Sequence, residues 1–192
     1  MIDLSGRFVV KLLFYVCVFS LSACISDASH KGKVTNPAQE NTIDRSKEIP
    51  VQNETFVCLK DMHPVRGFFV GNILGDLDST LAAANSPEGA VYPPGSIIQL
   101  VPTEVMIKHH KGWSEKTSDW EFFELSVSKE GSEIKVRGTT QAVNKFGGNC
   151  LECHQKAEPQ WDFVCEDNHG CDALPIPGFL IKRAQKKDPR CD

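Results

Sequence analysis

The sequence has no internal repeat, no large cluster of basic residues and no apolar run long enough to cross a membrane. Its N-terminal apolar stretch, "LLFYVCVF" from Leu12 to Phe19, is much shorter than the roughly 20 residues that a membrane-spanning helix needs. The net charge is -4 at pH 7, and Lys and Arg gather only in "IKRAQKK", which is typical of a solvated helix face. These absences argue against nucleic acid as a partner and against a retained transmembrane helix.

The N-terminus instead has the order of an export signal, because basic residues, the apolar stretch and small residues follow one another. The tripeptide Leu21-Ser22-Ala23 before Cys24 resembles the bacterial lipoprotein cleavage box. We therefore expect residues 1–23 to be removed and Cys24 to carry a lipid that tethers the protein to the periplasmic side of a membrane. Ile25 in place of an aspartate favours the outer membrane. An ordinary signal peptide and an uncleaved anchor are the alternatives.

The amino-acid composition differs between residues 24–55 and residues 56–192. Residues 24–55 are polar, mixed in charge and without hydrophobic periodicity, so they bury too little apolar area to offset their conformational entropy. We expect this segment to be a flexible tether. Residues 56–192 are richer in Phe, Val, Ile and Leu and have the length of one domain.

The segment "CLECH", from Cys150 to His154, carries the clearest chemical signal. It matches the C-x-x-C-H signature of haem c attachment. Positions i and i+3 lie on one face of a helical turn, so both sulfurs can reach the two vinyl groups of one porphyrin. His154 follows closely enough to bind the iron from the same side. The predicted cofactor is one covalent haem c, held by Cys150 and Cys153 with His154 as axial iron ligand.

Zinc and a plain disulfide are the competing explanations of this motif. A single C-x-x-C lacks the second ligand pair of a structural zinc site, and export places cysteines where disulfides form. The signal, the lipid and the haem account for four of the eight cysteines. Among the three connectivities of the other four, we expect Cys58 with Cys191 and Cys165 with Cys171.

Methionine is scarce, and none follows Met106. A methionine sixth ligand would have to come from Met62 or Met106, both upstream of the attachment motif. The commonest small electron-transfer cytochromes have the reverse order. This order disfavours a simple electron carrier with methionine and histidine as its two iron ligands.

The residues before the motif are organised as short strands. β-Branched or aromatic runs between turn residues predict strands at 96–101, 105–109, 121–128 and 132–138, and the last two form a hairpin across residues 129–131. Helices are expected at 76–85, 150–156 and 178–186. The predicted fold class is α+β, mainly an antiparallel β-sheet with a C-terminal haem-attachment helix and short flanking helices.

Three segments, "PPGSIIQLVPTEVMIKHH", "SDWEFFEL" and "CLECH", resemble the cytochrome P-460 superfamily, which also contains the cytochrome c-prime-beta proteins. The resemblance covers roughly Tyr92 to His154 and does not extend to the tail after Ala157. It implies a β-rich, usually homodimeric domain with one haem c near its end, a five-coordinate iron and an open distal side. The P-460 cytochromes proper oxidise hydroxylamine, whereas the c-prime-beta relatives bind small gases such as nitric oxide.

The resemblance also singles out Lys108, because a lysine bound covalently to the porphyrin distinguishes the P-460 cytochromes. Lys108 lies in "VMIKHH", where such a lysine or a distal residue is expected. A sheet-edge lysine that faces water is the simpler interpretation. Without the cross-link, Phe122 or Phe123 would form a distal aromatic wall, and only one of this pair can point inward.

The remaining candidates are histidines and tryptophans. Four histidines could supply the sixth ligand, although a surface histidine is commoner: His63, His109, His110 and His169. The tryptophans are expected to pack around the porphyrin or in the core, with hydrogen-bonded indole N–H groups: Trp113, Trp120 and Trp161.

Three functions follow from these features. The first is a lipid-tethered periplasmic haem protein whose open iron binds or redox-converts a small nitrogen-oxide ligand, nitric oxide or hydroxylamine. The second is a cytochrome that passes single electrons to a redox partner protein. The third is a haem-free binding domain stabilised by disulfides.

Overall fold

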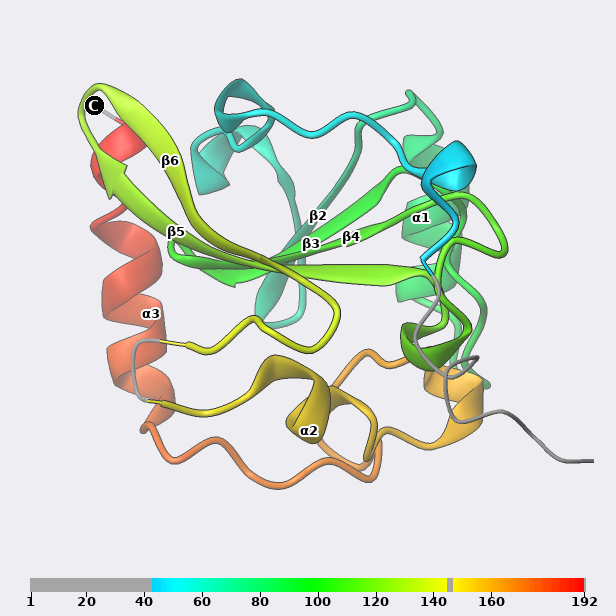
Figure 1. Ribbon diagram of the computed structural model, residues 1–192. Coiled ribbons are helices and arrows are strands. Elements are labelled where there is room, and N and C mark those ends of the chain that lie inside the picture. The colour runs from blue at the N-terminus through cyan, green and yellow to red at the C-terminus, as the bar shows by residue number, and fades with distance from the viewer. Residues whose placement is uncertain (1–42, 145–146, 192) are drawn as a thin grey trace, which may run out of the picture. The chain divides into compact units, whose positions relative to one another are not determined.

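Figure 1 shows the computed structural model of this protein, which describes residues 43–144 and 147–191. The predicted export signal and lipidation site, with Cys17 and Cys24, lie outside these residues. Six strands form one sheet, and each is antiparallel to the next strand in the chain. They are β1 (His63–Val65), β2 (Phe68–Asn72), β3 (Ser96–Val101), β4 (Glu104–Lys108), β5 (Trp120–Ser128) and β6 (Gly131–Gly138).

The helices are short. The α-helices are α1 (Leu77–Ala84), α2 (Cys150–His154) and α3 (Gly178–Lys186). Single 3-10 turns are η2 (Arg45–Lys47), η3 (Asn53–Thr55), η4 (Leu59–Asp61), η5 (Glu115–Thr117), η6 (Pro159–Trp161) and η7 (Pro189–Cys191). Across residues 43–144 and 147–191, no helix has the length and apolar character needed to cross a membrane.

The α+β class expected from the sequence is confirmed. The four predicted strands are β3 to β6, and the last two form the expected hairpin across residues 129–131. The three predicted helices are α1 to α3, and Asp76 caps α1 by accepting a hydrogen bond from the Ser79 N–H (3.3 Å). The sequence pattern does not predict β1 and β2. Strand β1 is short and contains Pro64, which disfavours a strand.

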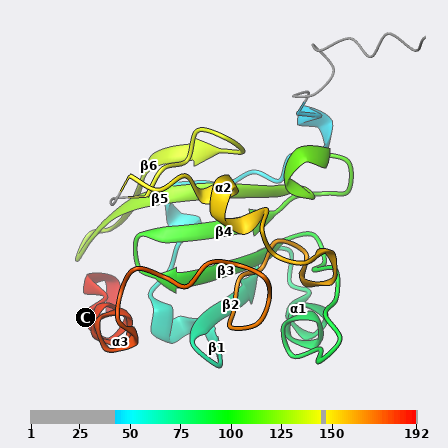
Figure 2. The same cartoon turned by 90° about the horizontal axis from the view of Figure 1, so that it is seen from below.

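The two faces of the sheet bury different hydrophobic clusters. Ile98, Met106 and Phe122 lie side by side across β3, β4 and β5 and belong to one cluster; we call their side of the sheet the cavity face. Ile97 and Ile107, one position away, belong to the cluster on the opposite face. Figure 2 shows α2 lying over β4 and β5, and the orange segment after it passing over β3. The chain after β6 therefore covers the cavity face.

The folded domain begins earlier than the sequence suggests. Ile49 and Val51 are 4% and 3% exposed, and the Ile49 N–H donates to Nδ1 of His109 (2.9 Å). Residues 43–55 therefore belong to the domain, and the predicted boundary at residue 55 is wrong. These apolar residues show no helical period because the segment has only the short 3-10 turns η2 and η3.

Both predicted disulfides are confirmed. Cys58 and Cys191 join the start of the domain to its end, with their Cα atoms 5.0 Å apart. Cys165 and Cys171 close a short loop after α2, with their Cα atoms 5.7 Å apart. The second bridge shapes the segment that lies over the cavity face.

Candidate functional site

Helix α2 carries Cys150, Cys153 and His154 within little more than one turn. Asn149 fixes its start, because its Oδ1 accepts the Glu152 N–H (3.2 Å) and its side-chain amide donates to the Thr140 carbonyl (2.8 Å). Leu151 is buried and packs into the cluster on the cavity face, which fixes the rotation of the helix. Of the cysteines that the structure describes, Cys150 and Cys153 are those outside disulfides, and both are half-buried.

A cleft of about 1190 Å³ lies between the cavity face and the chain that covers it. This volume is above the roughly 300–1,000 Å³ of ordinary small-molecule pockets, so a porphyrin is not too large for it. Both free cysteines and His154 line the cleft. The sheet contributes apolar lining residues: Phe68, Ile98, Leu100, Val105, Met106, Phe122 and Phe123.

The His154 imidazole is held in one tautomer. Its Nδ1 lies 2.7 Å from the backbone carbonyl oxygen of Phe163. Because a carbonyl oxygen only accepts, Nδ1 carries the proton and Nε2 keeps its lone pair. Desolvation lowers the pKa of His154, and the hydrogen bond to Phe163 opposes this shift. A neutral imidazole with an available Nε2 is the form that binds a metal ion.

The two thiols do not have the character of catalytic redox cysteines. Burial, with added repulsion from nearby carboxylates, raises the pKa of Cys150 to about 12, and burial also raises the pKa of Cys153. Catalytic C-x-x-C pairs instead have a lowered thiol pKa. Among the described residues, the group of three ligand atoms close enough for a metal is Cys58, Asp188 and Cys191, where both sulfurs are already bonded to each other.

These observations fit a covalently bound haem. Two unpaired thiols stand on one helix with a neutral imidazole beside them, and all three line a cleft of sufficient volume whose sheet side is mostly apolar. The Nε1 atom of Trp161, another lining residue, is buried without a hydrogen-bond partner. A buried donor of this kind is available to a polar group of a bound molecule.

The structure separates the candidates for a sixth ligand. Met106 and His169 line the cleft, and Met106 is 4% exposed. Met62 packs in the cluster on the opposite face. His63 and His110 are exposed and are not among the lining residues. Met106 and His169 are thus the side chains that the fold brings to the same cleft as His154.

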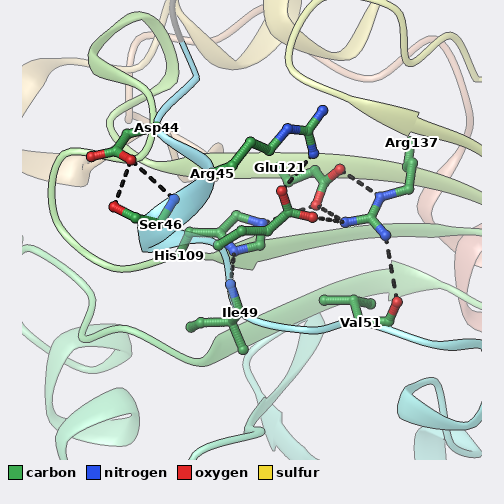
Figure 3. A network of polar contacts seen from close by, with 9 residues as sticks. Asp44, Arg45, Ser46, Ile49, Val51, His109, Glu121 and Arg137 are labelled. Atoms are coloured by element: carbon green, nitrogen blue, oxygen red, sulfur yellow. Dashed lines mark hydrogen bonds and ion pairs between the residues drawn. The ribbon is translucent and has the colours of Figure 1, made fainter.

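His109 serves a different purpose, as Figure 3 shows. It is fully buried, and its Nδ1 accepts the Ile49 N–H (2.9 Å) while its Nε2 donates to Glu121 (2.9 Å). Arg137 completes the network with two contacts of 2.7 Å to the same carboxylate. Burial raises the pKa of Glu121, but the hydrogen bonds from His109 and Arg137 outweigh this and hold its pKa below the ordinary value. Both ring nitrogens of His109 are therefore engaged away from the cleft.

Lys108 is buried, so its interpretation as a water-facing sheet-edge lysine is wrong. Its Nζ lies 2.7 Å from each carboxylate oxygen of Asp162 and 3.3 Å from the Ser118 hydroxyl. Burial lowers the pKa of the Lys108 ammonium, and Asp162 opposes that shift. Lys108 is not among the residues that line the cleft. A covalent link from Lys108 to a haem stays a prediction, and it would require this ion pair to open.

The aromatic candidates divide between the two faces. Phe122 lies against His154, with ring centroids 5.2 Å apart. Phe123 instead packs on Phe56 at the same centroid distance in the opposite cluster. Both residues are among those that line the cleft, but Phe122 is the one that belongs to the cluster on the cavity face and contacts His154.

The tryptophans also differ. Trp113 and Trp120 are buried, and the Trp120 indole N–H donates to the Asp162 carbonyl (2.7 Å). Trp161 lines the cleft and stacks on His169, with ring centroids 3.7 Å apart. The expectation of a hydrogen-bonded indole is confirmed for Trp120 and is wrong for Trp113 and Trp161, whose Nε1 atoms have no partner.

In the tail after Ala157, the sequence patterns single out Trp161 and His169 but not Phe163. Trp161, Phe163 and His169 all come from this segment, and Phe163 acts through its backbone carbonyl. Gly170 allows the loop to approach α2, because it has φ +93° and a Cβ there would lie 2.8 Å from the Lys156 carbonyl oxygen. The Phe163 carbonyl contact leaves no signal in the sequence. The available signal is Asp162, a single charged residue between two aromatic residues in "PQWDFV".

The chain was compared with models of known protein families, with curated proteins and with solved structures, and none of the three comparisons gave a match.

Proposed function

We propose that this chain is an exported, lipid-tethered c-type haem protein that holds one haem c through Cys150, Cys153 and His154. One observation carries the proposal. The Phe163 carbonyl fixes the His154 tautomer so that Nε2 is available, and two unpaired thiols share the helix and the cleft with it. The resemblance to the cytochrome P-460 superfamily points to the same cofactor.

Each of the proposed residues would hold a different part of the haem. Each thiol would add across one vinyl group, forming a C–S bond and placing the thiol hydrogen on the porphyrin side chain, so no atom is lost. His154 would supply Nε2 to the iron, and the apolar residues on the sheet side of the cleft would pack against the porphyrin. Arg66 lines the cleft and is paired with Glu166. Its guanidinium would also be the cation available to the carboxylate groups of the porphyrin. The bound haem would supply an iron that takes up small ligands and exchanges single electrons.

The favoured function is binding or redox conversion of nitric oxide or hydroxylamine at an open iron site. Three of the four histidines proposed as sixth ligands, His63, His109 and His110, do not line the cleft. Phe122 and Met106 give the sheet side of the cleft an apolar lining that admits small, weakly polar molecules. Lys108 has its ammonium engaged by Asp162, which favours a haem without a lysine cross-link.

Single-electron transfer is the second candidate. Met106 and His169 line the same cleft as His154, and either side chain as sixth ligand would close the iron to added ligands. The N-terminal lipid would then keep the protein near a membrane-associated redox partner.

The test is expression of the full chain in a bacterial host that matures c-type cytochromes. We expect the peptide containing residues 150–154 to gain the mass of one intact haem. The matched control is Cys150→Ala/Cys153→Ala, which should lose it. A haem-free wild-type peptide would refute the proposal. Absorption spectra then separate the two functions. A five-coordinate ferrous form that binds nitric oxide supports the first, whereas a six-coordinate form that becomes five-coordinate in Met106→Leu or His169→Ala supports the second.

A further inference from the structure

The backbone that carries the Phe163 carbonyl has an unusual conformation. Asp162 and Phe163 both have positive φ values, 48° and 67°, and neither is glycine. Left-handed backbone is unfavourable for residues with a side chain, and two such residues in succession persist only where their surroundings hold them. Here the contacts of Asp162 hold the two residues in this conformation.

Asp162 is held from four directions. Its carboxylate accepts Lys108 Nζ at both oxygens (2.7 Å each), the Ser118 hydroxyl (2.8 Å) and the Tyr92 N–H (2.9 Å). Its backbone carbonyl accepts the Trp120 indole N–H (2.7 Å). The Lys108 and Asp162 side chains are 4% and 2% exposed. Water therefore does not compete for these contacts, which tie the tail to β4 and β5.

The carbonyl group of Phe163, the residue after Asp162, is hydrogen-bonded to His154, the candidate iron ligand. The Val164 N–H donates to the Trp161 carbonyl (2.8 Å), which closes a turn around Asp162 and Phe163. This turn directs the Phe163 carbonyl at Nδ1 of His154 (2.7 Å). The ion pair between Lys108 on β4 and Asp162 in the tail is thus connected to the imidazole through one strained turn.

We propose that Lys108 and Asp162 form a positioning pair, which holds the Phe163 carbonyl against His154 and so sets how strongly Nε2 donates to the iron. The iron part of this inference rests on the proposed function. A hydrogen bond donated from Nδ1 makes the opposite nitrogen of the ring a stronger donor, which stabilises the oxidised form of a bound metal. Loss of the pair should therefore raise the reduction potential.

The test uses Lys108→Met and the neutral double variant Lys108→Met/Asp162→Asn. The double variant avoids an unpaired buried carboxylate and remains informative if the single variant does not fold. Lys108→Arg keeps the cation and should retain wild-type behaviour. The matched control is Asp188→Asn/Arg190→Met, which removes a second buried ion pair with side chains 0% and 3% exposed.

Two measurements on the full mature chain decide the matter. In spectroelectrochemical titration, the double variant should have a higher reduction potential than wild type, Lys108→Arg and the control. In nitrogen-15 NMR of histidine-labelled protein, its His154 Nδ1–H should exchange with water faster than in wild type. The NMR measurement is repeated in the Cys150→Ala/Cys153→Ala background, where haem attachment is not required.

The outcomes separate the two proposals. Faster exchange in the double variant would establish the positioning pair even if the wild-type chain acquired no haem, a result that would refute the proposed function alone. A folded double variant with wild-type exchange and, where haem is bound, a wild-type potential would refute the positioning pair and leave the haem proposal standing. An equal shift in the Asp188 and Arg190 control would also refute it, because the effect would then follow from lost stability alone.

Discussion

Removal of the Lys108 ammonium has a cost that can be worked out from its surroundings. Lys108→Met keeps much of the side-chain volume but leaves the Asp162 carboxylate, 2% exposed, without its cation. Breaking a buried ion pair from one side costs about 3–5 kcal/mol, because a desolvated charge remains. With a urea m-value of about 2 kcal/mol/M, a loss of about 4 kcal/mol lowers the unfolding midpoint by about 2 M.

The control is Lys135→Met, which removes the cation of an exposed pair with Glu133, whose side chains are 48% and 62% exposed. Such surface pairs contribute at most about 1 kcal/mol, so its midpoint should move by no more than about 0.5 M. Adding Asp162→Asn to Lys108→Met should recover part of the lost stability, because the unpaired charge is gone. If Lys108→Met unfolds at the same urea concentration as Lys135→Met, the assignment of Asp162 as a desolvated carboxylate is wrong.

Two further predictions concern the fold. Cys58→Ala/Cys191→Ala opens a bridge across a separation of 133 residues and should cost about 5 kcal/mol by loop entropy, whereas Cys165→Ala/Cys171→Ala, across 6 residues, should cost about 2 kcal/mol; urea titrations that give the reverse order would contradict this. The folded-state pKa of Glu121 lies below its unfolded value of about 4.5, so its stabilisation is complete above that pH and is lost as the pH falls through the folded-state pKa. Unfolding midpoints measured against pH should therefore fall less steeply on the acid side in Glu121→Gln than in wild type, and equal slopes would refute the assignment.

Local sequence patterns predict the regular elements well. The alternation of Phe123, Leu125 and Val127 with polar neighbours places the β5–β6 hairpin, because a strand with one buried face has a period of two. Asp76 and Asn85 mark both ends of α1. The number of cysteines left after the C-x-x-C motif predicts two bridges, and the confirmed pairing joins the ends of the domain.

Contacts between distant segments are not encoded in such patterns. Ile49 is isolated in a polar stretch, yet its backbone N–H bonds to His109, 60 residues later. Lys108 looks like a solvated charge until the tail brings Asp162 to it across a separation of 54 residues. In both cases the partner is fixed by packing against the sheet, which no local period reveals.

Residue identity and local spacing are sufficient to predict the C-x-x-C-H motif, the antiparallel strands before it and the even number of remaining cysteines. Tertiary structure alone decided that His154 meets the Phe163 carbonyl, that Met106 and His169 share its cleft, and that Lys108 is buried. The physical reason is that strand alternation fixes which face a side chain occupies, but only the folded tail determines which groups cover that face and complete its hydrogen bonds.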